Sequence, residues 1–132
     1  MSVQRSTAAR DAANDSFEAV VGVAPLLRLR TGTKPANCAA SRSGTILATI
    51  TLPSDWLSAS SAGVKAKLGS WVANASASGA VGYYEIMDST GTTCHEQGTA
   101  GTSGTDMITD VASTTSGQPV TVTAYAMTAG NP

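Results

Sequence analysis

Short runs of alternating or β-branched residues, separated by turn-forming residues, limit most strongly how this chain can fold. Apolar and charged side chains alternate in "LLRLRT" at residues 26–31, and "TILATITL" at residues 45–52 is a β-branched run. The breaks, among them "TGTKPAN", "SRSG" and "DSTG", carry the Gly, Pro, Asn, Asp and Ser that tight turns favour. About eight short strands at this spacing are typical of a β-sandwich.

The predicted fold is mainly β. We expect an antiparallel β-sandwich of jelly-roll type, because the runs are short and turn residues stand between them. A length of 132 residues suits one modest core, and the abundant Ala, Gly, Ser and Thr suit close packing and tight turns. The predicted strands are residues 26–31, 45–52, 64–68, 71–77, 81–87, 92–97, 107–111 and 119–127.

The N-terminal segment alone has the period of a helix. Gly22 stands where a C-cap glycine belongs, and Pro25 confirms the stop. The apolar stripe is thin, so the helix must lie on the rest of the fold or on another subunit. We therefore divide the chain into a helical arm, residues 1–22, and a β-sandwich domain, residues 23–132. The residues of the stripe are Ala9, Ala13, Phe17, Val20 and Val21.

Charge and hydropathy exclude several classes of partner. Lys and Arg total 8 against 9 Asp and Glu, so the net charge of -1 gives no reason to expect nucleic acid or an anionic membrane as partner. The N-terminal residues lack the apolar run of a signal peptide, and no stretch is long and apolar enough to span a membrane. We therefore expect a protein made in the cytoplasm, without a nucleic-acid or membrane partner.

The stretch with the most reactive side chains is "DSTGTTCHEQG" at residues 88–98, which sets Cys94, His95 and Glu96 side by side. With "YYEIM" before it, the stretch predicts a hairpin in which Gly91 takes a positive φ at the turn. Successive strand residues point to opposite faces, so we expect Cys94 and Glu96 on one face and His95 on the other. The three side chains then cannot converge, and we expect no enzyme active site.

Metal, cofactor and carboxylate sites find little support. Two cysteines and one histidine are too few for a four-ligand zinc site, and no phosphate-binding loop is present. We expect no catalytic residue, cofactor or metal. Cys38 and Cys94 either form a disulfide or stay as two free thiols. The reducing compartment of synthesis argues against the disulfide but does not decide between the two. Most of the available carboxylates stand in turn sequences, where such side chains accept backbone hydrogen bonds. A pair of catalytic carboxylates of the glycosidase type would have to come from Asp55, Glu85, Asp88, Glu96, Asp106 and Asp110.

Aromatic and basic residues offer further candidates for contact. Trp56 either plugs one end of the core or anchors a partner from the surface. Tyr83 and Tyr84 are neighbours on a strand, so one is expected in the core and the other on the surface, where a ring can stack on a sugar. Arg28, Arg30 and Lys34 form a small basic strand face, which is either a protected edge or a docking surface for an acidic neighbour.

Three segments carry a resemblance to a known family. The most specific pieces are "PANCAA" at residues 35–40, "LPSDWL" at 52–57 and "DSTGTTCH" at 88–95. With their surroundings, which cover nearly the whole chain, they resemble a family of small proteins encoded among the virion structural genes of tailed bacteriophages and prophages. The resemblance implies a virion component rather than an enzyme, and it supplies no catalytic residues.

From this resemblance and the turn-rich sandwich we expect a capsid decoration or cement protein that binds and reinforces the major capsid lattice. It would belong to the virion, be assembled in the bacterial host cytoplasm, and form a homo-oligomer on the major capsid protein or other virion subunits. The alternatives are a tail or head fibre module that binds receptor carbohydrate, and a structural protein of the neck or tail. The expected partner contacts are Phe17, Val20, Val21, Arg28, Arg30 and Trp56.

Overall fold

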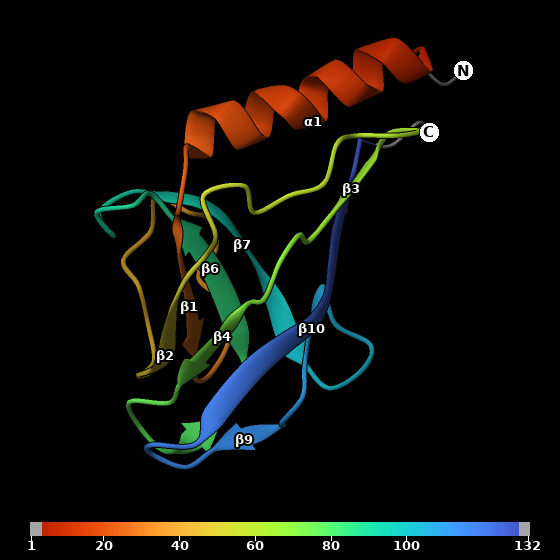
Figure 1. The fold of residues 1–132 in the computed structure, drawn as a ribbon. Coiled ribbons are helices and arrows are strands. Elements are labelled where there is room, and N and C mark those ends of the chain that lie inside the picture. Colours follow the sequence, from red (N-terminus) through yellow and green to blue (C-terminus); the bar gives the residue numbers. More distant parts are fainter. Residues whose placement is uncertain (1–3, 130–132) are drawn as a thin grey trace.

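A single helix lies across one end of a strongly curled β-sheet (Figure 1). The computed structural model describes residues 4–129. Within that range the helix α1 covers Thr7–Val21, and the remaining elements are strands. The strands are β1 (Leu26–Arg30), β2 (Ile46–Thr51), β3 (Val64–Ala66), β4 (Val72–Asn74), β5 (Gly79–Ala80), β6 (Tyr83–Met87), β7 (Cys94–Gly101), β8 (Met107–Thr109), β9 (Ser113–Thr114) and β10 (Pro119–Thr128).

The main sheet has eight strands in the order β2-β1-β6-β7-β8-β10-β3, with β4 also paired to β10. All of these pairs are antiparallel except β7 with β8, which run parallel. The sheet curls until its ends approach, and the Ser76 backbone N–H donates to the Leu47 carbonyl at 2.8 Å beside β2. Strands β2, β1, β6 and β7 therefore face β8, β10 and β4 across the core (Figure 1).

The prediction of a mainly β, sandwich-like fold with an N-terminal helix is confirmed. Each of the eight predicted strand ranges overlaps a strand of the structure, and β7 and β10 extend beyond the ranges predicted for them, 92–97 and 119–127. The two strands outside the prediction are β5 and β9, which pair with each other and have two residues each. Strands this short have no period to detect, because alternation becomes a signal only over about four residues.

Strand β1 has the alternation that the sequence predicted. Leu27 and Leu29 are fully buried, whereas Arg28 and Arg30 point to the outer face of the sheet. Its neighbour β6 differs, because all five of its residues are buried. Both faces of β6 are therefore covered, the inner one by the core and the outer one by the loop of residues 31–45.

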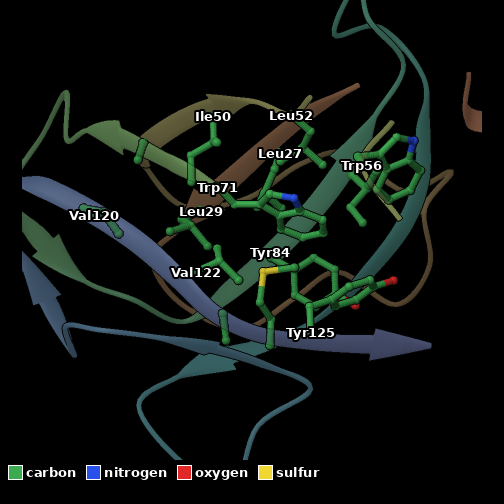
Figure 2. Close-up of a cluster of buried hydrophobic side chains, with 14 of the residues drawn as sticks. Leu27, Leu29, Ile50, Leu52, Trp56, Trp71, Tyr84, Val120, Val122 and Tyr125 are labelled. Carbon is green, nitrogen blue, oxygen red and sulfur yellow. The ribbon is translucent and has the colours of Figure 1, made fainter. Parts of the chain in front are cut away.

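A row of aromatic rings connects the helix to the middle of the core. Figure 2 shows four of these rings, Trp56, Trp71, Tyr84 and Tyr125. The centroid of the Phe17 ring lies 6.3 Å from that of Trp56, which lies 6.2 Å from Trp71. Trp71 in turn lies 5.5 Å from Tyr125, and Tyr125 lies 6.0 Å from Tyr84. Edge and tilted contacts of this kind add attraction to the apolar area that the rings bury.

Helix α1 has clear signals at both ends. It begins after Ser6, whose Oγ accepts from the backbone N–H of Ala9 at 3.1 Å, as an N-cap side chain does. It ends at Gly22, which has φ of 92° and donates its N–H to the Glu18 carbonyl. The glycine stop predicted from the sequence is confirmed, and only glycine takes such a φ without strain.

Polar contacts hold α1 on β3 and the turn before it. The buried Asn14 donates to the Gly63 carbonyl at 2.8 Å, and the Gly63 N–H donates to Asp11 at 2.8 Å. The Lys65 ammonium, which is 3% exposed, lies 2.9 Å from the Glu18 carboxylate. The helix therefore lies on the rest of the fold, which is the first of the two placements that its thin apolar stripe allowed.

Replacing Trp56 with alanine tests the aromatic row. Trp56 is fully buried and donates from its indole N–H to the Gly22 carbonyl at 3.1 Å. We expect Trp56→Ala to lower the free energy of unfolding by about 3–5 kcal/mol, measured by urea denaturation, because it leaves a cavity between helix and sheet. Val72→Ala, at a half-exposed site, should change it by less than about 0.5 kcal/mol. Equal effects of the two changes would contradict a central role for Trp56.

Candidate functional site

The hairpin of β6 and β7 contains the stretch that the sequence singled out. Its connection runs over residues 88–93, and Gly91 has φ of 73°, which confirms the predicted turn. The Asp88 carboxylate accepts from the backbone N–H groups of Thr92 at 2.8 Å and Thr93 at 3.3 Å. These bonds, the one from Thr92 above all, hold the pKa of Asp88 at about 2. Asp88 is thus a turn acceptor that organises the connection.

A β-bulge interrupts the alternation in β7. Met87 pairs with Cys94 and Ile86 pairs with Glu96, so His95 is an extra residue opposite the bond between Met87 and Ile86. A bulge of this kind shifts the residues on its two sides by one position relative to the faces of the sheet. The prediction that Cys94 and Glu96 share a face is therefore wrong.

Side-chain contacts show the two faces directly. Cys94 points to the outer face, where its sulfur lies 3.7 Å from Nη1 of Arg42. Glu96 points to the inner side, where its Oε1 accepts from the hydroxyls of Tyr84 and Tyr125, each at 2.6 Å. The cysteine and the glutamate thus take part in separate structures, and the apparent triad does not assemble.

On the outer face, Cys94 is joined to Cys38 by a disulfide. The two Cα atoms are 5.3 Å apart, and the residues are separated by 56 positions in the sequence. Of the alternatives that the sequence left open, the structure has the bridged one. The bond attaches the loop of residues 31–45 to β7.

A buried carboxylate lies under the same loop. Glu85 is fully buried, with its Oε1 2.8 Å from Nε of Arg30 and its Oε2 3.2 Å from Nη1 of Arg42. The same Arg42 nitrogen donates to Oε1 of Gln97 at 2.8 Å. We call these four residues, Arg30, Arg42, Glu85 and Gln97, the outer cluster. Two guanidinium groups compensate one buried negative charge, which is the condition for such a charge to be tolerated.

Further bonds fix the loop over the cluster. Arg42 donates from Nη2 to the carbonyl of Asn37 at 2.7 Å and to that of Ala40 at 3.0 Å. The Tyr83 hydroxyl donates to the Ser43 carbonyl at 2.6 Å. The loop is therefore held by an ion pair, a disulfide and backbone contacts, and it serves as a lid that covers β6.

On the inner side, Glu96 borders a polar hollow of about 400 Å³. Asp106 lies at the same hollow, where its Oδ2 accepts from the Thr99 backbone N–H at 3.0 Å. Burial, together with the charge of Glu96, raises the pKa of both tyrosines well above the usual phenol range. The phenols thus remain protonated donors to Glu96. The hollow is lined by Tyr84, Glu96, Gln97, Asp106, Tyr125, Ala126, Met127 and Thr128.

The structure separates the predicted partner contacts of the helix and of Trp56. Val21 is 4% exposed and Trp56 is fully buried, and the partly buried Phe17 packs on Trp56. This corrects the expectation for Val21 and Trp56, whose side chains have almost no surface left for a partner. The expected contact of Phe17 stays a prediction, because its side chain is only partly buried. Val20 differs, since 68% of it is exposed.

The arginines and tyrosines are also used within the chain. Arg30 pairs with Glu85, and Arg28 donates to the Gly91 carbonyl at 3.3 Å. Glu85 therefore neutralises Arg30, whereas the bond from Arg28 to a carbonyl does not cancel its charge. Docking of this face on an acidic neighbour stays a prediction. Tyr83 is fully buried and Tyr84 is 3% exposed. The expectation that one of them offers a ring to a sugar is wrong, because the loop covers the outer face and the core takes the inner one.

The described part of the chain has neither a metal-ligand cluster nor a helix able to span a membrane. Among residues 4–129, no group of three or more His, Cys, Asp or Glu side chains could hold a metal ion. Within the same range, α1 has neither the length nor the apolar character to cross a membrane.

Comparisons with models of known protein families, with curated proteins and with solved structures found no match to this chain.

Neutralising Glu85 tests the outer cluster. Glu85→Gln would leave two buried guanidinium groups without their counter-charge, so we expect a loss of about 3 kcal/mol in the free energy of unfolding. Asp15→Asn removes a carboxylate that is 61% exposed in an ion pair with Lys65, and should cost less than about 1 kcal/mol. Urea denaturation at neutral pH measures both. A loss for Glu85→Gln as small as that for Asp15→Asn would contradict the assigned role.

Counting thiols tests the disulfide. When the protein is purified without reductant and then unfolded, we expect no reaction with a thiol reagent. After a reductant is added, two thiols should react, which matches the 2 cysteines of the chain. The double change Cys38→Ser, Cys94→Ser should lower stability by about 2–4 kcal/mol, because the unfolded chain gains freedom. Two reactive thiols before reduction would contradict the bridge.

Proposed function

We propose that this chain is a non-enzymatic structural protein of a phage virion, a decoration or cement protein that binds and stabilises the major capsid lattice. The resemblance to small virion proteins supports this proposal, and so does the use that the fold makes of the resembling segments. "PANCAA" contributes Cys38 to the lid, "LPSDWL" contributes Trp56 to the core, and "DSTGTTCH" forms the hairpin connection. The residues that carry the resemblance thus have structural roles in this chain.

The observation that carries the proposal is that three of the chemically reactive side chains are occupied in structural contacts. Cys94 is bridged to Cys38, Glu85 lies between two arginines, and Asp88 caps a turn. A small domain fastened in this way is suited to reinforcing a shell. It would bury surface across junctions between capsid subunits, where a stable contact takes about 1,200–2,000 Å². A homo-oligomer on the lattice, assembled in the host cytoplasm, fits this role.

A second candidate is a tail or head fibre module that binds receptor carbohydrate. The polar hollow favours it, because the carboxylates of Glu96 and Asp106 can accept hydrogen bonds from sugar hydroxyls. The buried rings of Tyr84 and Tyr125 would bound such a site without stacking on the sugar face. A structural protein of the neck or tail stays as a further alternative.

Copy number in purified virions tests the decoration proposal. We expect hundreds of copies per particle, and we expect particles that lack the gene to lose resistance to heat and osmotic shock, because fewer contacts cross the capsid junctions. Quantitative mass spectrometry against the major capsid protein measures the first, and survival of infectivity measures the second.

A handful of copies per particle would contradict decoration and favour the fibre or neck alternatives. A glycan array then separates these two. Binding that Asp106→Asn abolishes and that Asp110→Asn leaves intact would assign the chain to the fibre class. Absence from virions would overturn the proposal as a whole.

A further inference from the structure

The two most exposed large apolar side chains of the described residues lie three positions apart in the sequence, at the end of α1. Val20 and Val23 are each 68% exposed, compared with 48% for Val72. Both lie close to Gly22, where the helix ends. Val23 borders a hollow of about 350 Å³, which is lined by Asp15, Glu18, Ala19, Gly22, Val23, Ser54 and Asp55. We call this surface, with Val20, the α1-end face.

The charged side chains that line the hollow are all acidic. The C-terminal end of a helix carries partial negative charge and is commonly balanced by Lys, Arg or His in the last turn. The last turn of α1 has no basic residue. It has Glu18 instead, with Asp15 one turn before and Asp55 across the hollow.

One cation compensates part of this charge. Lys65 lies 2.6 Å from Asp15 and 2.9 Å from Glu18, so these two carboxylates share one ammonium group. Asp55 lines the same hollow as a third carboxylate. Acidic residues at this helix end oppose the helix dipole, and two valines are exposed to water. A basic residue in the last turn and polar residues in place of the valines would stabilise the isolated chain more. Such local departures are expected where a surface has another use.

The α1-end face is also rigid. The Gly22 N–H donates to the Glu18 carbonyl at 3.0 Å, and the Gly22 carbonyl accepts from the indole of Trp56 at 3.1 Å. Trp56 itself is fully buried. A partner would therefore find the face already formed, which reduces the ordering cost of association.

We propose that the α1-end face is a docking site for a segment of another subunit that carries an apolar side chain beside a Lys or Arg. The apolar side chain covers Val20 and Val23, and the cation meets Glu18, Asp55 and the helix end. Charge complementarity selects this occupant over an acidic or purely apolar one. The identity of the partner as a virion subunit rests on the proposed function, whereas the chemistry of the face does not.

A titration with two synthetic peptides tests the face without reference to virions. One short, capped peptide has a central Leu-Lys-Leu-Lys, and the other has Glu in place of Lys. We expect the Lys peptide to shift the amide and methyl resonances of Val20 and Val23, to bind at least about tenfold more tightly than the Glu peptide, and to weaken as salt is raised. Equal binding of the two peptides, or shifts confined to other surfaces, would overturn the proposal.

Variants locate the effect. The double change Val20→Ser, Val23→Ser should abolish the shifts, and Asp55→Asn should weaken binding of the Lys peptide severalfold. Val72→Ser, which changes an exposed valine on β4 away from α1 (Figure 1), is the matched control and should bind as the wild type does. If Val72→Ser weakened binding as much as the double change, the assigned face would be wrong.

Two further measurements test the identity of the partner separately from the binding properties of the α1-end face. A photo-crosslinking residue at position 23 should join this chain in purified virions to a segment with Lys or Arg beside an apolar residue. Absence of the chain from virions would overturn the proposed function and leave the peptide result standing. A wild-type dimer in sedimentation that the double valine change dissociates would overturn the docking proposal, because it would assign the face to a second copy.

Discussion

The buried ion pair between Glu85 and its two arginines is the interaction on which the rest of the outer face depends. The carboxylate is fully buried, so its charge is tolerable only while both guanidinium groups are in place. Arg30 comes from β1 and Arg42 from the lid. A one-residue slip of β1 against β6 would turn Arg30 into the core. The pair thus fixes strand register and lid position together.

The elements that the sequence predicted well are those set by local pattern. Alternation located the strands, and Gly22 and Gly91 marked the helix end and the hairpin turn. The bulge at His95 could not be predicted in this way, because it depends on how β7 pairs with β6 and leaves no local mark. A single inserted residue was enough to place Cys94 and Glu96 on opposite faces, against the simple alternation.

The outer cluster and the polar hollow were beyond prediction for a related reason. Arg42 lies in a turn-rich segment and reaches Glu85 across 43 positions, and nothing near either residue indicates the other. Asp106 and Tyr125 meet at the hollow because β10 pairs with β8, where Tyr125 lies opposite Met107. On the helix, the predicted apolar stripe included both Val20 and Val21. Consecutive helical residues point about 100° apart, so only Val21 lies in the core.

The aromatic row gives the protein an optical reporter of its own folding. Trp56 touches Phe17 of the helix, and Trp71 touches Tyr125 of β10, so each indole contacts a different layer while the two contact each other. Both are fully buried. Detachment of α1 would change the surroundings of Trp56 first, whereas opening of the sheet would change those of Trp71. With no added label, their emission can distinguish loss of the helix from collapse of the whole domain.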